Sequence, residues 1–170
     1  MQDLYDDIFT TTWLPFTVIA GRLLAAAFFG ALIGLEREWQ SHPAGLRTHM
    51  LVSLAAATFA ILGIEIVHSE HFQENAIQLD PLRLIEAVTA GVAFLAAGTI
   101  IVSRGKVKGL TTGAGLWLSG AIGLAGGLGY WQIAGLGTLL AIIVLALLHQ
   151  VSKAVDRRAG RSSEPPAPPA

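Results

Sequence analysis

The sequence contains no cysteine, and only 14% of its 170 residues are charged. The lack of cysteine excludes a disulfide framework, a thiolate metal site and a cysteine nucleophile. A soluble domain usually carries roughly 25% charged residues, so this chain has few of the groups that keep a surface in water. Basic residues are also missing from the first fifteen positions, where Asp3, Asp6 and Asp7 stand. A cleavable signal peptide needs a basic start, so we expect the first apolar run to be a retained membrane helix.

Hydrophobic residues make up 53% of the chain and gather in long runs between the few charges. Each run approaches the roughly 20 residues that a helix needs to cross about 30 Å of hydrocarbon. The sequence therefore predicts an all-α fold, a polytopic transmembrane bundle of about five helices. The expected spans are residues 15–35, 48–67, 81–103, 110–129 and 131–150. The alternative is four spans with one re-entrant segment, because the last two runs meet in a glycine-rich stretch.

The basic residues are distributed unevenly about these spans. With five helices, nine of the eleven fall on one side of the membrane, whereas Arg83 falls on the other side and Arg22 lies within the first span. Because basic loops stay in the cytoplasm, we expect the N-terminus outside and the C-terminus in the cytoplasm. The nine are Arg37, Arg47, Arg104, Lys106, Lys108, Lys153, Arg157, Arg158 and Arg161.

The composition divides the chain into three parts. Residues 1–14 form an acidic external segment, residues 15–150 form the transmembrane domain, and residues 151–170 form a cytoplasmic tail. The tail is basic and then rich in proline and alanine, without apolar periodicity, so we expect it to be disordered.

Two ionisable residues lie within predicted spans, where such groups are costly and are functional candidates. Arg22 lies in the first span, and Glu86 lies at a similar but shallower depth in the third. We expect an Arg22–Glu86 ion pair that neutralises both charges. Alternatively, Arg22 extends to the interface and Glu86 stays in water.

The densest polar cluster is predicted on the cytoplasmic face. Glu36, Arg37 and Glu38 close the first helix, and two glycine–threonine segments open the second and fourth helices. Threonines there are expected to cap free N–H groups, and two positive helix ends beside basic residues could bind an anion or an acidic partner. The alternative is that these residues only mark helix starts. The two segments contain Gly45, Arg47 and Thr48, and Gly109, Thr111 and Thr112.

Small residues recur every four positions on two of the predicted helices. Such stripes let helix backbones approach closely in a membrane, so we interpret them as packing faces, within the chain or in a homo-oligomer. A weak internal repeat with an offset of 64 residues also aligns Gly34 with Gly98 and Thr48 with Thr112. The stripes are Ala26, Gly30 and Gly34, and Gly115, Ser119, Gly123 and Gly127.

The outer loop around His68 and His71 contains residue types that bind metals, including Glu65, Glu70 and Glu74. Carboxylates could attract Mg²⁺ and histidines a transition metal, but we interpret the segment as a solvated loop. We expect neither a metal site nor a cofactor. No nucleophile–base pair stands out, so we do not expect an enzyme.

Several motifs together resemble the MgtC/SapB family of bacterial membrane proteins over roughly residues 20–130. Two features depart from that family: the third helix has fewer glycines than usual, and well-known members continue into a soluble C-terminal domain. The motifs are Arg22-Leu-Leu, Gly30-Ala-Leu-Ile-Gly34-Leu-Glu36-Arg37-Glu38, Ala44-Gly45-Leu46-Arg47-Thr48-His49, Phe94-Leu-Ala-Ala-Gly98-Thr-Ile-Ile, Arg104-Gly-Lys-Val-Lys-Gly109-Leu110-Thr111-Thr112 and Leu116-Trp117.

The resemblance implies a multi-pass protein of the bacterial plasma (inner) membrane, tied to survival at low magnesium and, in some pathogens, to virulence. It also implies membrane-protein partners such as the ATP synthase. The motif residues that it marks are Arg22, Glu36, Arg37, Glu38, Gly45, Arg47, Thr48, Gly98, Gly109, Thr111 and Thr112.

Two functions follow from these observations. The leading hypothesis is a regulator in the lipid bilayer that acts through membrane-protein partners, either as a monomer or as a homo-oligomer, without binding nucleic acid. The alternative is a small transporter or channel for Mg²⁺, K⁺ or H⁺ that uses Arg22, Glu86 and the threonine-marked helix ends.

Overall fold

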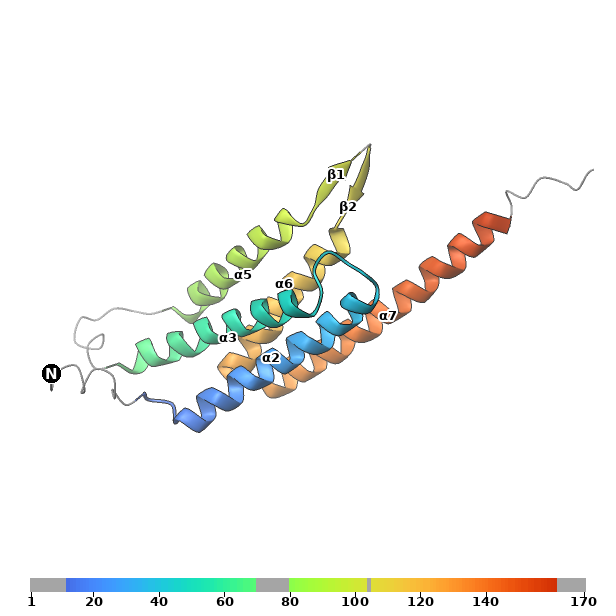
Figure 1. Cartoon of the computed structure of the whole chain (residues 1–170). Coiled ribbons are helices and arrows are strands. Elements are labelled where there is room, and N and C mark those ends of the chain that lie inside the picture. Colours follow the sequence, from blue (N-terminus) through green and yellow to red (C-terminus); the bar gives the residue numbers. More distant parts are fainter. Residues whose placement is uncertain (1–11, 70–79, 104, 162–170) are drawn as a thin grey trace, which may run out of the picture.

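The computed structural model describes residues 12–69, 80–103 and 105–161. Five helices and a short antiparallel β-hairpin make up this part of the chain (Figure 1), which confirms the predicted all-α class and the helix number. By length and composition, α2 and α3 qualify as membrane-crossing helices. The elements are α2 (Phe16–Trp39), α3 (Leu46–His68), α5 (Pro81–Gly98), β1 (Ile101–Ser103), β2 (Lys106–Lys108), α6 (Leu110–Leu128) and α7 (Trp131–Arg161).

Three helices form the centre of the bundle. Helix α3 packs along both α2 and α6, and α2 also contacts α6. Helix α5 lies mainly against α6 and touches α3 less, whereas α7 lies against α6 and α2. The loop 40–45 and the β-hairpin are at the same end of the bundle (Figure 1), which we call the hairpin end.

Glycines bring the central helices into backbone contact. A Cβ atom on Gly34 of α2 would lie 2.6 Å from the Cα atom of Leu46, and one on Gly123 of α6 would lie 2.1 Å from the carbonyl oxygen of Ser53. Gly30 and Gly127 meet α3 at similar distances, 2.7 Å and 2.5 Å from carbonyl oxygens. The predicted small-residue stripes are therefore confirmed as packing faces within the chain.

Local capping explains where several helices start and stop. Pro81 occupies the first turn of α5, as predicted, and the Asp80 carboxylate accepts a hydrogen bond from the Leu82 N–H at 2.9 Å. Helix α6 begins after Gly109 and ends at Gly129, both in the left-handed region with φ of 88° and 87°. Tyr130 N–H then bonds back to Ala125 O at 2.9 Å, which closes the helix end tightly.

Three boundaries differ from the sequence prediction. Helix α2 continues through Glu36–Glu38 to Trp39, and α7 continues to Arg161, beyond the predicted end at residue 150. Lys, Ala, Val and Arg are compatible with a helix, so the composition of residues 151–161 does not stop one. Helix α5 ends at Gly98 rather than at Ser103, because the β-branched residues that follow pair across the hairpin, with Val102 opposite Val107.

Candidate functional site

Buried polar side chains gather along the contacts of α3 with its neighbours. Arg37 of α2, His49 and Ser53 of α3, and Thr112 and Ser119 of α6 are each at most 2% exposed. Because hydroxyl, imidazole and guanidinium groups are costly to bury, they need partners or a function. The sequence placed Arg37 and Thr112 in a cytoplasmic polar cluster, whereas the structure buries both of them.

Arg37 is the most costly of these side chains to bury, because its guanidinium is charged. Its Nη1 lies 3.7 Å from Glu36 Oε2, and the two side chains are 3% and 13% exposed. Its Nε and Nη2 are buried and have no hydrogen-bond partner among the described residues. These two nitrogens form the side of the guanidinium that can hold a carboxylate, a phosphate or two separate acceptors.

His49 presents an acceptor in the same region. Its Nδ1 lies 2.8 Å from Gly45 O, so Nδ1 carries the proton and donates it to that carbonyl oxygen in the neutral ring. Nε2 then holds the lone pair; it is buried, and within the described chain it has no hydrogen-bond partner. It faces α6, where a Cβ on Gly115 would lie 3.1 Å from it. The ring is therefore fixed by α3 itself and packed against a glycine.

The start of α3 is capped by a carboxylate from α2. Glu38 Oε2 accepts a hydrogen bond from the Leu46 N–H at 3.0 Å, and a Cβ on Gly45 would collide with this oxygen. Gly45 is the N-cap residue, so the prediction that Thr48 caps this helix is wrong; at α6 the N-cap is likewise Gly109. The positive end of α3 is thus partly neutralised by the chain itself, which leaves less of it for an external anion.

A second group of predicted residues surrounds the junction of α5 and α6. Gly98 ends α5, and a Cβ on Gly109 would lie 2.0 Å from Thr99 O, which brings the start of α6 against the end of α5. Thr48 lines the same region from α3 and is exposed, as are Arg47 and Thr111. Apart from Arg22 and Glu86, the predicted site residues therefore fall into two clusters at the hairpin end.

Arg22 and Glu86 do not pair, so that prediction is wrong. Arg22 Nη1 donates to Gly127 O at 2.8 Å, and Nη2 lies beside Gly129. The guanidinium thus satisfies a carbonyl at the C-terminus of α6, a favourable place for a cation. Glu86 is exposed on α5, which packs against α6 and α3 rather than α2.

The end of the bundle away from the hairpin is closed by Glu65 of α3. Its two carboxylate oxygens accept hydrogen bonds from the N–H groups of Trp13 and Leu14 at 2.7 and 3.0 Å. The Trp13 ring stacks on His68 at 3.6 Å between centroids. Of the predicted metal-type residues, Glu65 and His68 are therefore engaged in structure, and Glu70, His71 and Glu74 lie outside the described residues. Over the described ranges, no group of three histidine or carboxylate side chains is placed to hold a metal ion.

Three of these five buried side chains, those of His49, Ser53 and Ser119, were not selected as site residues in the sequence analysis. The usable signal was spacing: His49, Ser53 and Ala57 recur every four residues, and this face of α3 meets the glycine stripes of α2 and α6.

Comparison with known proteins identifies the family. Residues 23–154 match the MgtC family. The chain belongs to the MgtC family. It is 35% identical over 135 residues to YhiD of Escherichia coli K12, which covers 77% of this chain and 60% of that protein. It is 35% identical over 149 residues to MgtC of Brucella abortus (88% and 59%) and 37% identical over 134 residues to SrpB of Synechococcus elongatus (74% and 71%).

The chain thus spans about 60% of the length of YhiD and of the Brucella MgtC. The name of the Escherichia coli relative carries a provisional assignment as a magnesium transporter. No solved structure matches the chain. The family resemblance inferred from the motifs around Gly34, Gly45 and Gly109 is confirmed.

Proposed function

We propose that the chain is a five-span protein of a bacterial inner membrane that helps cells adapt to low magnesium by regulating membrane-protein partners. Family membership and the magnesium-related names of relatives support the magnesium link. The two long apolar helices and the charge bias support a membrane location. In this arrangement the hairpin end is cytoplasmic and the N-terminus is outside.

The observation that carries the regulatory proposal is the surface beside the loop 40–45. The residues that shape this loop are used internally: Glu38 caps α3, Gln40 bonds to Glu36, and the His42 N–H donates to Arg37 O at 3.2 Å. Trp39 on one side of the loop is 84% exposed, and Arg47 on the other side is exposed. Tryptophan and arginine are the residue types that most often dominate binding energy. A loop held by these internal hydrogen bonds, with an exposed tryptophan before it and an exposed arginine after it, suits a partner surface, and the ATP synthase is one candidate through the family.

Affinity capture from membranes after crosslinking in cells grown at low magnesium tests this proposal. We expect Trp39→Ala and Arg47→Glu each to reduce recovery of a specific membrane partner at least tenfold, because hot-spot truncations cost about 2 kcal/mol or more. The matched control is Leu82→Ala, an exposed substitution at the opposite end of the bundle, which should leave recovery unchanged. Equal recovery with all three variants, at equal protein levels, contradicts the proposal.

Ion transport is the second candidate function, and the unpartnered Arg37 and His49 atoms are the specific observation that favours it. Intramembrane ionisable groups without full partners are typical of ion and proton pathways. Purified protein in liposomes should pass Mg²⁺, K⁺ or H⁺ above the rate of empty liposomes if this function holds, and His49→Gln should abolish the flux. A flux at background level for the native protein supports the regulatory proposal instead.

A further inference from the structure

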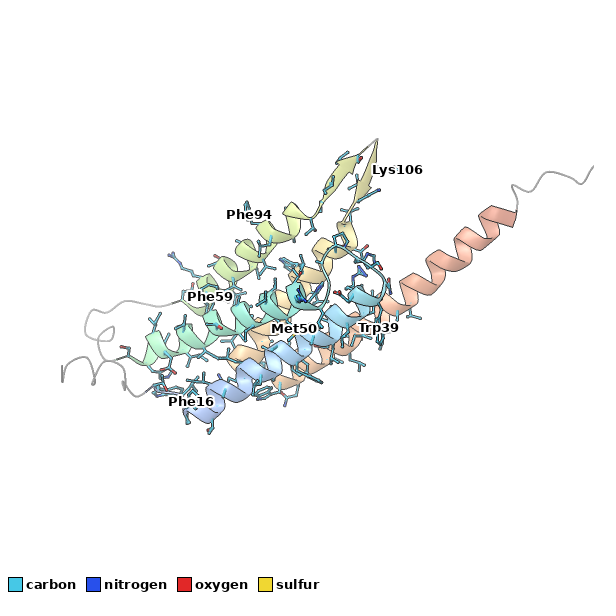
Figure 2. The ribbon with its side chains drawn as sticks, in the orientation of Figure 1. Phe16, Trp39, Met50, Phe59, Phe94 and Lys106 are labelled. Carbon is cyan, nitrogen blue, oxygen red and sulfur yellow. The ribbon has the colours of Figure 1, made fainter. Side chains whose placement is uncertain are left out.

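Helices α3 and α5 diverge enough to leave a groove between them. Two adjoining cavities, of about 380 and 480 Å³, follow this groove and share the side chains of Val52 and Leu95. The first is lined only by apolar residues, including Phe59 on α3 and Leu84 and Gly91 on α5. The second adds Thr48 and Thr99 at the hairpin end. Figure 2 shows Phe59 and Phe94 on these two helices and Lys106 on the hairpin beyond them.

The dimensions of the groove decide what can fill it. It follows α5 from Leu84 to Thr99, which is about 22 Å at 1.5 Å per residue. This length exceeds the about 15 Å of one leaflet's hydrocarbon, so the groove can line a single extended acyl chain. All the residues that line the first cavity are apolar, as contact with an acyl chain requires.

The hairpin end of the groove supplies cationic and hydroxyl groups for a headgroup. Arg47 directly precedes Thr48 and is exposed. Lys108 directly precedes Gly109, whose backbone packs against Thr99 O, and Lys108 is exposed as well. Each threonine at the mouth of the groove therefore has a basic residue next to it. Basic residues at the cytoplasmic interface attract anionic lipid, by about 1 kcal/mol or roughly fivefold for each residue.

We propose that the groove between α3 and α5 binds one anionic phospholipid, with an acyl chain along Val52, Gly91 and Leu95 and the phosphate at Thr48 and Lys108. The bound lipid fills the space that α5 leaves beside α3. The inference rests on the proposed membrane location and is independent of the regulatory role.

Two glycines in the groove allow a direct test. Gly91 and Gly98 line the two cavities, and a Cβ on either would meet nothing within 4 Å, so Gly91→Phe and Gly98→Phe fill the groove without a backbone clash. Gly135 on α7 is equally open but lies away from the groove, and Gly135→Phe is the matched control. Each protein is placed in nanodiscs of equal phosphatidylglycerol and phosphatidylethanolamine with identical chains, and the retained lipid is measured by native mass spectrometry.

The native protein and Gly135→Phe should retain one phospholipid with at least a fivefold preference for phosphatidylglycerol, whereas Gly91→Phe and Gly98→Phe should lose it. Lys108→Gln should lower the preference about fivefold, while Lys106→Gln, at the hairpin tip, should leave it nearly unchanged. Retention without headgroup preference, unchanged retention in both groove variants, or equal loss in Gly135→Phe overturns the proposal. A phosphatidylglycerol with a photoreactive acyl chain gives a readout that does not need the variants: adducts should map to α3 and α5, and adducts elsewhere contradict the site.

Discussion

The helix pairs α2–α3 and α5–α6 follow a similar sequence plan and pack differently. Helix α3 starts at Leu46 and α6 starts at Leu110, each after an N-cap glycine, with the offset of 64 residues that the internal repeat predicts. In the first pair Gly34 lies against Leu46, whereas its counterpart Gly98 meets nothing within 4 Å. In the second pair the residues that meet are Thr99 after α5 and Gly109 before α6, with the β-hairpin extending between them, and Gly98 lines the groove instead. A shared pattern of glycines therefore does not ensure close packing, because the connection decides whether the glycines meet a backbone.

The largest expected effect comes from the buried cation, which exists only in the first pair. Arg37→Met should lower the free energy of unfolding by about 3–5 kcal/mol, because it leaves the partly buried Glu36 carboxylate without its cation, with only Gln40 bonded to it. Arg47→Met, an exposed substitution at the second residue of α3, is the control and should change stability by less than about 0.5 kcal/mol. Unfolding in mixed micelles followed by circular dichroism measures both. If the two variants have similar free energies of unfolding, the buried cation does not distinguish the α2–α3 pair from the α5–α6 pair.

The matched glycines test the comparison directly. Gly34→Ala should destabilise by about 1–3 kcal/mol, because the added methyl would lie 2.6 Å from the Leu46 Cα atom and the helices must separate. Gly98→Ala should be neutral or stabilise by up to about 1 kcal/mol, since alanine favours a helix and meets no atom there. The same unfolding measurement applies. Equal effects at the two positions would show that the close approach at Gly34 is not what holds α2 to α3.

The contact between Glu38 and Gly45 is expected to have a smaller effect. Gly45→Ala should cost about 1 kcal/mol, because the new methyl displaces the carboxylate that caps α3 at Leu46. In a Glu38→Ala background the same substitution should cost much less, since the clash and the cap are already gone. A double-mutant cycle gives the coupling between the two residues. Additive effects would contradict the described contact.

The smallest expected effect concerns the hydroxyl of Ser53. It donates to Ala26 O across the α2–α3 interface at 2.7 Å, and its counterpart in the second pair is Trp117, which has no hydroxyl. Ser53→Ala should cost about 0.6 kcal/mol, the average of interhelical hydrogen bonds in membrane proteins. Thr58→Ala removes a hydroxyl that bonds only within α3, to Leu54 O, and should cost less than Ser53→Ala under the same conditions. The reverse order would argue that the bond to Ala26 contributes nothing to the interface.

The sequence was sufficient to predict structural features that depend on patterns repeated over many residues. Apolar runs predicted five helices, Pro81 marked a helix start, and four-residue spacing found the packing glycines. The sequence was insufficient where a single contact decides which secondary structure forms or which residues pair. The three-residue strands around Val102 and Val107 are too short for alternation to be recognised, so they were assigned to a helix and a turn.

The errors at the site have a related cause. Arg22 and Glu86 were paired by depth alone, but the rotation of each helix sets which side a residue faces, and Arg22 found a carbonyl of α6 instead. The burial of Arg37 and His49 depends on how far α2 extends past Glu36, which the run of charges concealed. The family motifs include both residues but do not show that they are inside the protein.

Two carboxylates hold the ends of α2 and α3 to each other: Glu65 of α3 binds the chain at the start of α2, and Glu38 of α2 binds the start of α3. Both contacts use only the first half of the chain, so this pair can form during synthesis before α5 is made. We expect nascent chains arrested soon after α3 has entered the bilayer to show α2–α3 crosslinks already. Later helices would then assemble on a finished template, and crosslinks that appear only after α6 is made would exclude this order.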